Sequence, residues 1–140
     1  MLLDLTKLCK AIESLETAIR CSHSPYLVEL DAGFPEVVRA AVIQNFEFTF
    51  ELSWKLLERW LAEKLGSAAV KGISHKALFR LAGERMLVDD PARWFSYFEA
   101  RNKTTHTYNA LVAEEVYAKA VMFLEDAKQL FNHLNRSEEI

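Results

Sequence analysis

The chain has 140 residues, of which 51% are hydrophobic and 26% charged, with a formal net charge of −3. This composition is typical of one folded domain and excludes a disordered chain. The acidic balance argues against a broad basic surface that grips long DNA or RNA, although it is compatible with a small site for one or two phosphates.

Nothing in the sequence indicates a membrane protein or a secreted one. No apolar run is long enough to span a bilayer, and the N-terminus lacks the basic start and continuous apolar stretch of a signal peptide. We therefore expect a cytoplasmic protein. No Cys/His cluster has the spacing of metal ligands, so neither a metal nor another cofactor is expected.

Apolar residues at helical spacing predict a first helix over about residues 2–22. A linker follows, in which Pro35 suits the start of the next helix. The second helix is predicted over about 36–65, and Gly66 ends it.

The second half of the chain carries three further helix patterns. Ser74 is a good N-cap for a third helix over about 75–87, and Asp90 followed by Pro91 predicts the start of a fourth. Apolar spacing predicts a fifth helix over about 109–134.

No strand-like alternation competes with these patterns. The sequence therefore predicts an all-α fold, an antiparallel up-and-down bundle of four to five helices. We expect a single domain over residues 1–140.

The second predicted helix is apolar on two faces. A second strip, formed by Phe48, Leu52 and Leu56, lies roughly opposite the main face. Both faces need cover, from another helix of the chain such as the short third one, or from a partner subunit. We expect a partner, because four or five helices are too few to bury every apolar face. The main face comprises Ile43, Phe46, Phe50, Trp54, Leu57 and Leu61.

An aromatic-rich stretch near residue 100 ends in an arginine. On a helix, Trp94, Phe98 and Arg101 share one face. A buried arginine needs an anionic partner, because an unpaired buried charge is costly. That partner is either a phosphate that Arg101 clamps or a carboxylate of Glu47 or Glu51 in a structural ion pair.

His106 and Tyr108 follow the arginine. His106 is a candidate general acid or base of phosphodiester chemistry, and the alternative is a histidine that hydrogen-bonds at a helix end. Tyr108 is a candidate nucleophile or acceptor, and the alternative is a half-buried tyrosine at the end of the bundle. The other histidines are assigned no function: His23, His75 and His133.

The threonines of residues 104–107 are poor in a helix interior, so we expect the helix to bend or end there. A regular helix would point Arg101 and His106 about 140° apart. The two side chains can therefore cooperate only if the backbone deviates or a second chain contributes one of them.

Other residues around the motif are candidate ligands of a substrate. Asn102 is placed to orient the arginine or to contact a ribose or phosphate, and Lys103 is a further candidate substrate-binding residue. Trp94, Phe95 and Phe98 suit base stacking, but aromatic residues at helical spacing more often belong to a core.

Two segments together resemble a known family. Arg101-Asn102-x-x-x-His106-x-Tyr108 resembles the R-x-x-x-x-H-x-Y pattern of HEPN domains. Residues 43–55, I-Q-N-F-E-F-T-F-E-L-S-W-K, resemble the Q-x-F-E-x-x-F-E-L-x-W-K helix of the nucleotidyltransferase substrate-binding proteins, the HEPN partners of minimal nucleotidyltransferases. The likeness covers nearly the whole chain. Residues 73–76, I-S-H-K, depart from the S-P-R-like start of the third helix that family members often carry.

The resemblance implies an all-α homodimer in which two copies of the motif face each other across a cleft. Many HEPN domains are metal-independent endoribonucleases. By this resemblance His106 would deprotonate a ribose 2′-hydroxyl or protonate the leaving oxygen, and Arg101 would stabilise charge on the phosphate. Asn102 would help to position that phosphate.

The resemblance also implies a control mechanism. In toxin–antitoxin pairs of this type, a separately encoded minimal nucleotidyltransferase can transfer adenylyl groups from ATP to the motif tyrosine, here Tyr108. The added phosphates would crowd and neutralise an arginine-lined site.

Three functional hypotheses follow. The first is a ribonuclease toxin neutralised by the nucleotidyltransferase. The second is a non-catalytic subunit that binds a nucleotide or substrate for that enzyme. The third is a dimeric scaffold in which Arg101 pairs with Glu47 or Glu51 for structural reasons alone.

Overall fold

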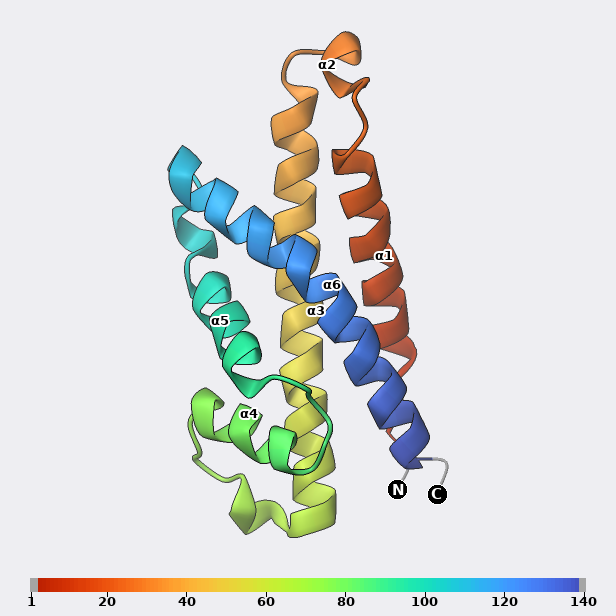
Figure 1. The fold of residues 1–140 in the computed structure, drawn as a ribbon, viewed down its shortest axis with the longest axis vertical. Helices are drawn as coiled ribbons and strands as arrows, with labels where there is room; N and C mark the ends of the chain where they lie inside the picture. The colour runs from red at the N-terminus through yellow and green to blue at the C-terminus, as the bar shows by residue number, and fades with distance from the viewer. Residues whose placement is uncertain (1–2, 139–140) are drawn as a thin grey trace.

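The structure, a computed structural model, describes residues 3–138 and is all-α, with no strand in that range. The long helix α3 forms the central column, α1 lies beside it, and α6 crosses both obliquely (Figure 1). Successive long helices run in opposite directions, which confirms the predicted up-and-down bundle. The α-helices are α1 Thr6–Ser22, α2 Leu27–Leu30, α3 Phe34–Leu65, α4 His75–Glu84, α5 Pro91–Asn102 and α6 Ala110–Glu138. The described residues also form two 3₁₀ turns, η1 Ser67–Ala69 and η2 Thr104–His106.

The predicted capping residues are confirmed. The side chain of Ser74 accepts a hydrogen bond from the backbone N–H of Ala77 at 3.1 Å, and Asp90 caps α5 in the same way through Arg93. Gly66 ends α3 with a φ of 92°, a left-handed conformation that glycine adopts without strain.

Several boundaries differ from prediction: α3 begins two residues early, at Phe34, and α6 ends four residues late, at Glu138. The helix α1 begins at Thr6, where the side chain of Asp4 accepts a hydrogen bond from the N–H of Thr6 at 3.0 Å, and residue 2 of the predicted helix lies outside the described residues. The helix α4 ends three residues early, because Leu87 turns back to bond its N–H to Ala82 at 2.9 Å. The predicted linker after α1 contains the single-turn helix α2.

The helix α3 has its second apolar strip covered from within the chain. Thr49 Oγ1 lies 3.3 Å from the carbonyl oxygen of Ala11, so this side of α3 faces α1. Leu52 and Leu56 follow Thr49 on that side, and both are wholly or partly buried. The cover thus comes from α1 rather than from the short α4. Only Phe48 of the strip stays exposed, at 58%.

A buried carboxylate joins α5 to α6. Asp126 of α6, with a side chain only 5% exposed, accepts hydrogen bonds from Nε and Nη2 of Arg93 at 2.7 and 2.6 Å. It also accepts a hydrogen bond from the hydroxyl of Tyr97. Burial and this bond raise the pKa of Tyr97 well above its usual value, and Asp126 likewise raises the pKa of Arg93. The carboxylate therefore fixes α5 on α6 through two successive turns.

No helix in the described part of the chain is both long enough and apolar enough to cross a bilayer.

Replacing Asp126 by asparagine is expected to lower the free energy of unfolding by about 2–3 kcal/mol, because a bidentate buried pair loses its charge. Urea denaturation measures the change. The matched control is Glu125→Gln on the preceding residue, whose exposed pair with Lys128 contributes no more than about 1 kcal/mol. Equal effects of the two substitutions would show that the buried network does not stabilise the fold.

Candidate functional site

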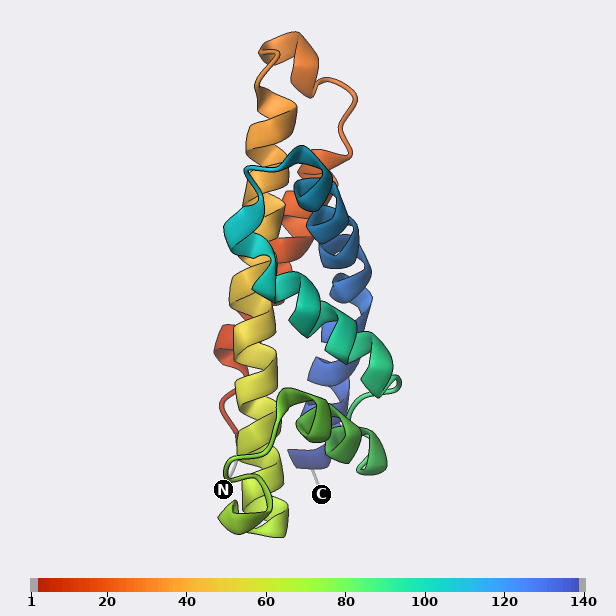
Figure 2. The ribbon, with the colours of Figure 1, turned by 90° about the vertical axis from the view of Figure 1, so that its left-hand side faces the viewer.

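The motif that follows α5 leaves the helical path, as its threonines predicted. The helix α5 ends at Asn102, the turn η2 spans Thr104–His106, and α6 begins at Ala110. Thr104 is buried, and its hydroxyl donates a hydrogen bond to the carbonyl oxygen of Arg101 at 2.8 Å. The backbone therefore changes direction between Arg101 and His106, close to the upper part of α3 (Figure 2).

Arg101 faces α3, where it meets the predicted carboxylate partner. Its Nε lies 3.2 Å from Oε1 of Glu51, and its Nη1 donates to the hydroxyl of Thr104 at 3.3 Å. The buried Nε–H, however, makes no hydrogen bond, because it is not aligned with the carboxylate oxygen. Arg101 is thus held at ion-pair distance with donor capacity to spare, and its side chain is 30% exposed.

Glu51 is fixed on α3 by neighbours other than Arg101. Its Oε2 accepts a hydrogen bond from the indole of Trp54 at 3.2 Å, and Lys55 lies 3.9 Å away. Among the described residues, no ion pair joins the other candidate, Glu47, to Arg101. The ion pair considered from the sequence therefore forms with Glu51, whereas Glu47 lines a neighbouring groove.

His106 and Tyr108 lie on the outer side of the turn. His106 is exposed, and Tyr108 is 86% exposed. Their ring centroids are 6.1 Å apart, at an interplanar angle of 73°. Within residues 3–138, no hydrogen bond or ion pair joins His106 to Arg101. One chain thus presents Arg101 and His106 on consecutive turns without direct contact between the two side chains.

The other predicted site residues have mixed surroundings. Asn102 is exposed to solvent beside Arg101. Lys103 forms an ion pair with Glu115 at 2.9 Å on the far side of the turn. Trp94 is fully buried in the aromatic core, whereas Phe98 remains half-buried at the surface.

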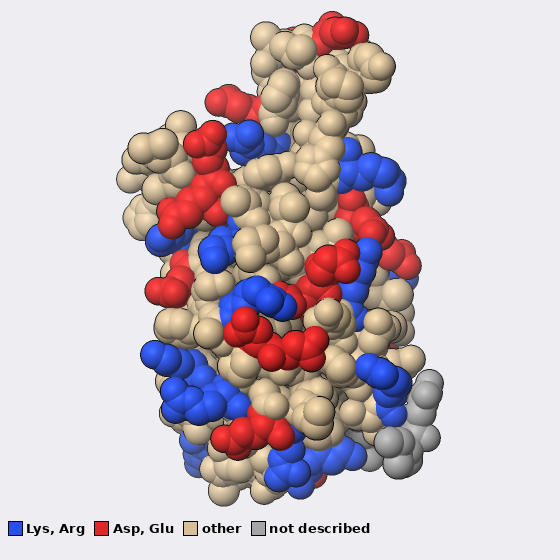
Figure 3. All heavy atoms as spheres, in the orientation of Figure 1, with Lys and Arg blue, Asp and Glu red and all other residues tan. Residues whose placement is uncertain are grey.

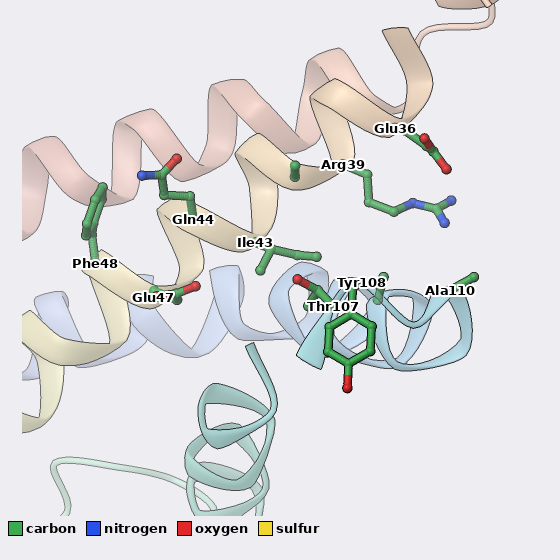
Figure 4. A pocket seen from close by; sticks show the side chains of 11 residues that line it. Glu36, Arg39, Ile43, Gln44, Glu47, Phe48, Thr107, Tyr108 and Ala110 are labelled. Carbon is green, nitrogen blue, oxygen red and sulfur yellow. The ribbon is translucent and has the colours of Figure 1, made fainter. Parts of the chain in front are cut away.

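A groove with a volume of about 530 Å³ lies between α3 and the segment from Thr107 to Ala113 (Figure 4). Glu36, Arg39 and Gln44 of α3 form one wall with Phe48, and the ring of Tyr108 lies at the opposite wall. Tyr108 directs its hydroxyl away from α3. The groove thus combines one cation, two carboxylates, an amide and two aromatic rings beside the motif.

His75 belongs to the surroundings of the site, a role that nothing in the sequence around it predicted. Its ring stacks on Phe98 at a centroid distance of 4.2 Å and meets the edge of Trp54 at 4.6 Å. Three helices meet at this contact, and no sequence spacing within one helix signals it. The described residues contain no cluster of three His, Cys, Asp or Glu side chains suited to a metal.

Known proteins with similar sequences and folds agree with this description. Residues 3–136 match the family described as nucleotidyltransferase substrate binding protein like. A Haemophilus influenzae relative named probable ribonuclease HepT is 30% identical over 139 residues, 98% of this chain and 95% of the relative.

Two solved structures have the same fold. HI0074 of Haemophilus influenzae, described as the fold of a substrate binding domain of a nucleotidyltransferase, matches with a TM-score of 0.87 at 30% identity. The match covers 94% of this chain and 99% of HI0074. A structure from Thermus thermophilus matches with a TM-score of 0.66 at 29% identity, over 89% of this chain and 98% of its own.

The family match spans nearly the whole described chain, and the two motifs that predicted it lie together in space where α3 meets the end of α5. The matched structures also share the bundle that brings these motifs together. This chain belongs to the nucleotidyltransferase substrate-binding protein-like family.

Proposed function

We propose that this protein is an endoribonuclease toxin whose activity is controlled by a separately encoded nucleotidyltransferase. The observation that carries the proposal is the state of Arg101, whose buried Nε lies beside Glu51 while the side chain as a whole remains 30% exposed. Such an arginine is held ready for an anion, and His106 lies one turn further along the chain. The relative named probable ribonuclease HepT supports the choice of RNA as that anion.

The chemistry needs only side chains that the motif supplies. A neutral His106 accepts the proton of a ribose 2′-hydroxyl, and the 2′-oxygen attacks the adjacent phosphorus. The bond from phosphorus to the 5′-oxygen breaks, and that oxygen takes a proton from an imidazolium. The products are a 2′,3′-cyclic phosphate and a 5′-hydroxyl. Arg101 stabilises the charge on the phosphate oxygens, with Asn102 as a further contact. Lys103 would reach RNA only after leaving its ion pair with Glu115.

A second copy of the chain would bring a second imidazole to the same phosphate. Apolar side chains lie exposed along one side of α3, namely Phe34, Val37 and Phe48, and Leu111 is exposed at the start of α6. Several exposed apolar side chains on one side of a helix are typical of an interface between subunits. In a homodimer built on this surface, the motifs of both chains would border one cleft.

Control by a nucleotidyltransferase would act through Tyr108. Its phenol is the most exposed aromatic side chain in the described range, so an enzyme can reach it without unfolding the turn. Adenylyl transfer joins the phenol oxygen to the α-phosphorus of ATP and releases pyrophosphate. The new phosphate then lies two residues from His106 and competes with RNA for the cations of the site.

The second candidate function is a non-catalytic subunit that binds a nucleotide for the nucleotidyltransferase. The groove beside Tyr108 favours it, because Arg39 and Gln44 offer donors and Phe48 offers a ring face. In this case the groove, not the Arg101 site, would determine the affinity for the nucleotide.

Substituting Arg101 or His106 by alanine is expected to reduce RNA cleavage by at least about a hundredfold, because each removes a group that acts in the transition state. Gel analysis of labelled RNA measures cleavage by the unmodified protein, and activity should persist in EDTA. His23→Ala, at a position after α1 and away from the motif, is the matched control. Equal, residual cleavage by all four proteins would exclude the ribonuclease and leave the binding subunit.

Co-expression with the nucleotidyltransferase is expected to increase the intact mass by one or more adenylyl units. Because Tyr108 supplies the accepting oxygen, Tyr108→Phe should abolish the increase, whereas Tyr26→Phe, at another exposed tyrosine, should not. Mass spectrometry of the purified proteins measures this. Adenylylation that survives Tyr108→Phe would place the modification elsewhere.

Phe48→Glu is expected to convert a dimer into a monomer, because it places a charge in the apolar interface. Light scattering coupled to size exclusion measures the molar mass. Met86→Glu introduces the same charge at an exposed position between α4 and α5 and serves as the control. A wild-type protein that is monomeric at all concentrations would contradict the dimer.

A further inference from the structure

Positive charge is concentrated in one part of the chain. Residues 55–85 contain seven Lys or Arg and three Glu, a surplus of four positive charges in a chain whose net charge is −3. This segment forms the C-terminal part of α3, the turn η1 and α4. Figure 3 shows a group of cationic side chains at the lower left, where Figure 1 places α4. The rest of the molecule is correspondingly acidic.

Half-buried aromatic rings connect this basic region to Arg101. Trp54 donates a hydrogen bond to Glu51, the ion-pair partner of Arg101, and its ring meets the ring of His75. His75 stacks on Phe98.

The row of rings continues along α5 to a cation of α4. Phe98 stacks on Phe95 at 5.8 Å, and Lys76 lies 5.4 Å from the centre of the Phe95 ring. Arg80 is exposed one helical turn beyond Lys76. Each contact joins the next, so the row runs without a break across α3, α4 and α5.

We propose that this surface is a binding track for single-stranded RNA, which leads the strand to the Arg101 site. The inference rests on the proposed ribonuclease function and adds the path of its substrate. Lys55, Lys76 and Arg80 would contact phosphates, and the rings of Phe95 and Phe98 would stack on bases. We define the RNA track as Lys55, Trp54, His75, Lys76, Arg80, Phe95 and Phe98.

The pairing of cations with ring faces favours single-stranded RNA over a duplex. Bases within a duplex are already stacked and paired, so they are not available to a protein ring, whereas a single strand can turn its bases outward. Two of the three cations are free of carboxylate partners, because Lys76 and Arg80 form no ion pair among the described residues. The third, Lys55, lies 3.9 Å from Glu51 and shares that carboxylate with Arg101. An acidic protein would use the same cations but gain little from stacked rings.

Binding of a short fluorescein-labelled single-stranded RNA, measured by anisotropy in the full-length His106→Ala protein, tests the track without cleavage. The double variant Lys76→Glu/Arg80→Glu should weaken binding by about tenfold or more. It should also reduce the slope of log K against log salt by about 1.4, because two phosphate contacts are lost. Phe95→Leu should weaken binding by roughly fivefold or more through lost stacking.

The matched control is Lys7→Glu/Lys10→Glu, which makes the same charge change on the exposed side of α1. It should leave RNA affinity within about twofold of the parent, and circular dichroism should show every variant folded. Equal loss in both double variants would show that only net charge matters and would overturn the track. Unchanged RNA affinity in Lys76→Glu/Arg80→Glu, the track variant, would also overturn the track. The same holds if this variant loses binding to the nucleotidyltransferase while its RNA binding stays intact.

Cleavage assays with an intact His106, run beside the binding assays, separate the two proposals. If no protein cuts RNA but the track variant alone loses binding, the track stands and the ribonuclease fails. If the wild type cuts RNA and the track variant binds and cuts equally well, the ribonuclease stands and the track is overturned.

Discussion

The position of the site depends on the buried carboxylate of Asp126. It holds α5 against α6 through Arg93 and Tyr97, which lie two turns and one turn before Arg101. With α5 fixed in this way, its C-terminal end meets α3, and the guanidinium of Arg101 lies beside Glu51. A charge buried without these donors would be strongly destabilising, so the clamp is satisfied only when α5 and α6 dock in this register. Fold stability and site geometry are therefore linked through one side chain.

The long helices, their caps and the break after Arg101 followed from the sequence, because these features depend on residues close together in the chain. Ser74 and Asp90 cap backbone N–H groups three residues away, and Gly66 directly follows the helix that it ends. The threonine run disfavours a helix wherever it occurs. The early end of α4 did not follow, since Met86 rather than a glycine adopts the left-handed conformation there, with a φ of 61°. Burial of Leu87 against the core stabilises that turn.

The surroundings of the site were only partly predictable, because they depend on contacts between residues far apart in the chain. The sequence named Glu47 and Glu51 as partners of Arg101 but could not choose between them, because the choice depends on how α5 crosses α3. The stack of His75 on Phe98 joins residues of two helices and was missed altogether. Net charge was also misleading, since it averages an acidic majority of the chain with a basic segment around α4.

Arg101 does not face solvent as a bare cation, because the carboxylate of Glu51 already lies beside it. A phosphate that enters the site must share the guanidinium with this internal competitor or displace it. For a small anion that binds only here, displacing Glu51 would cancel much of the binding free energy. A polymer that also binds at other points would keep most of its affinity. In the proposed ribonuclease, the ion pair would therefore favour an RNA strand bound at several points over free phosphate or a single nucleotide.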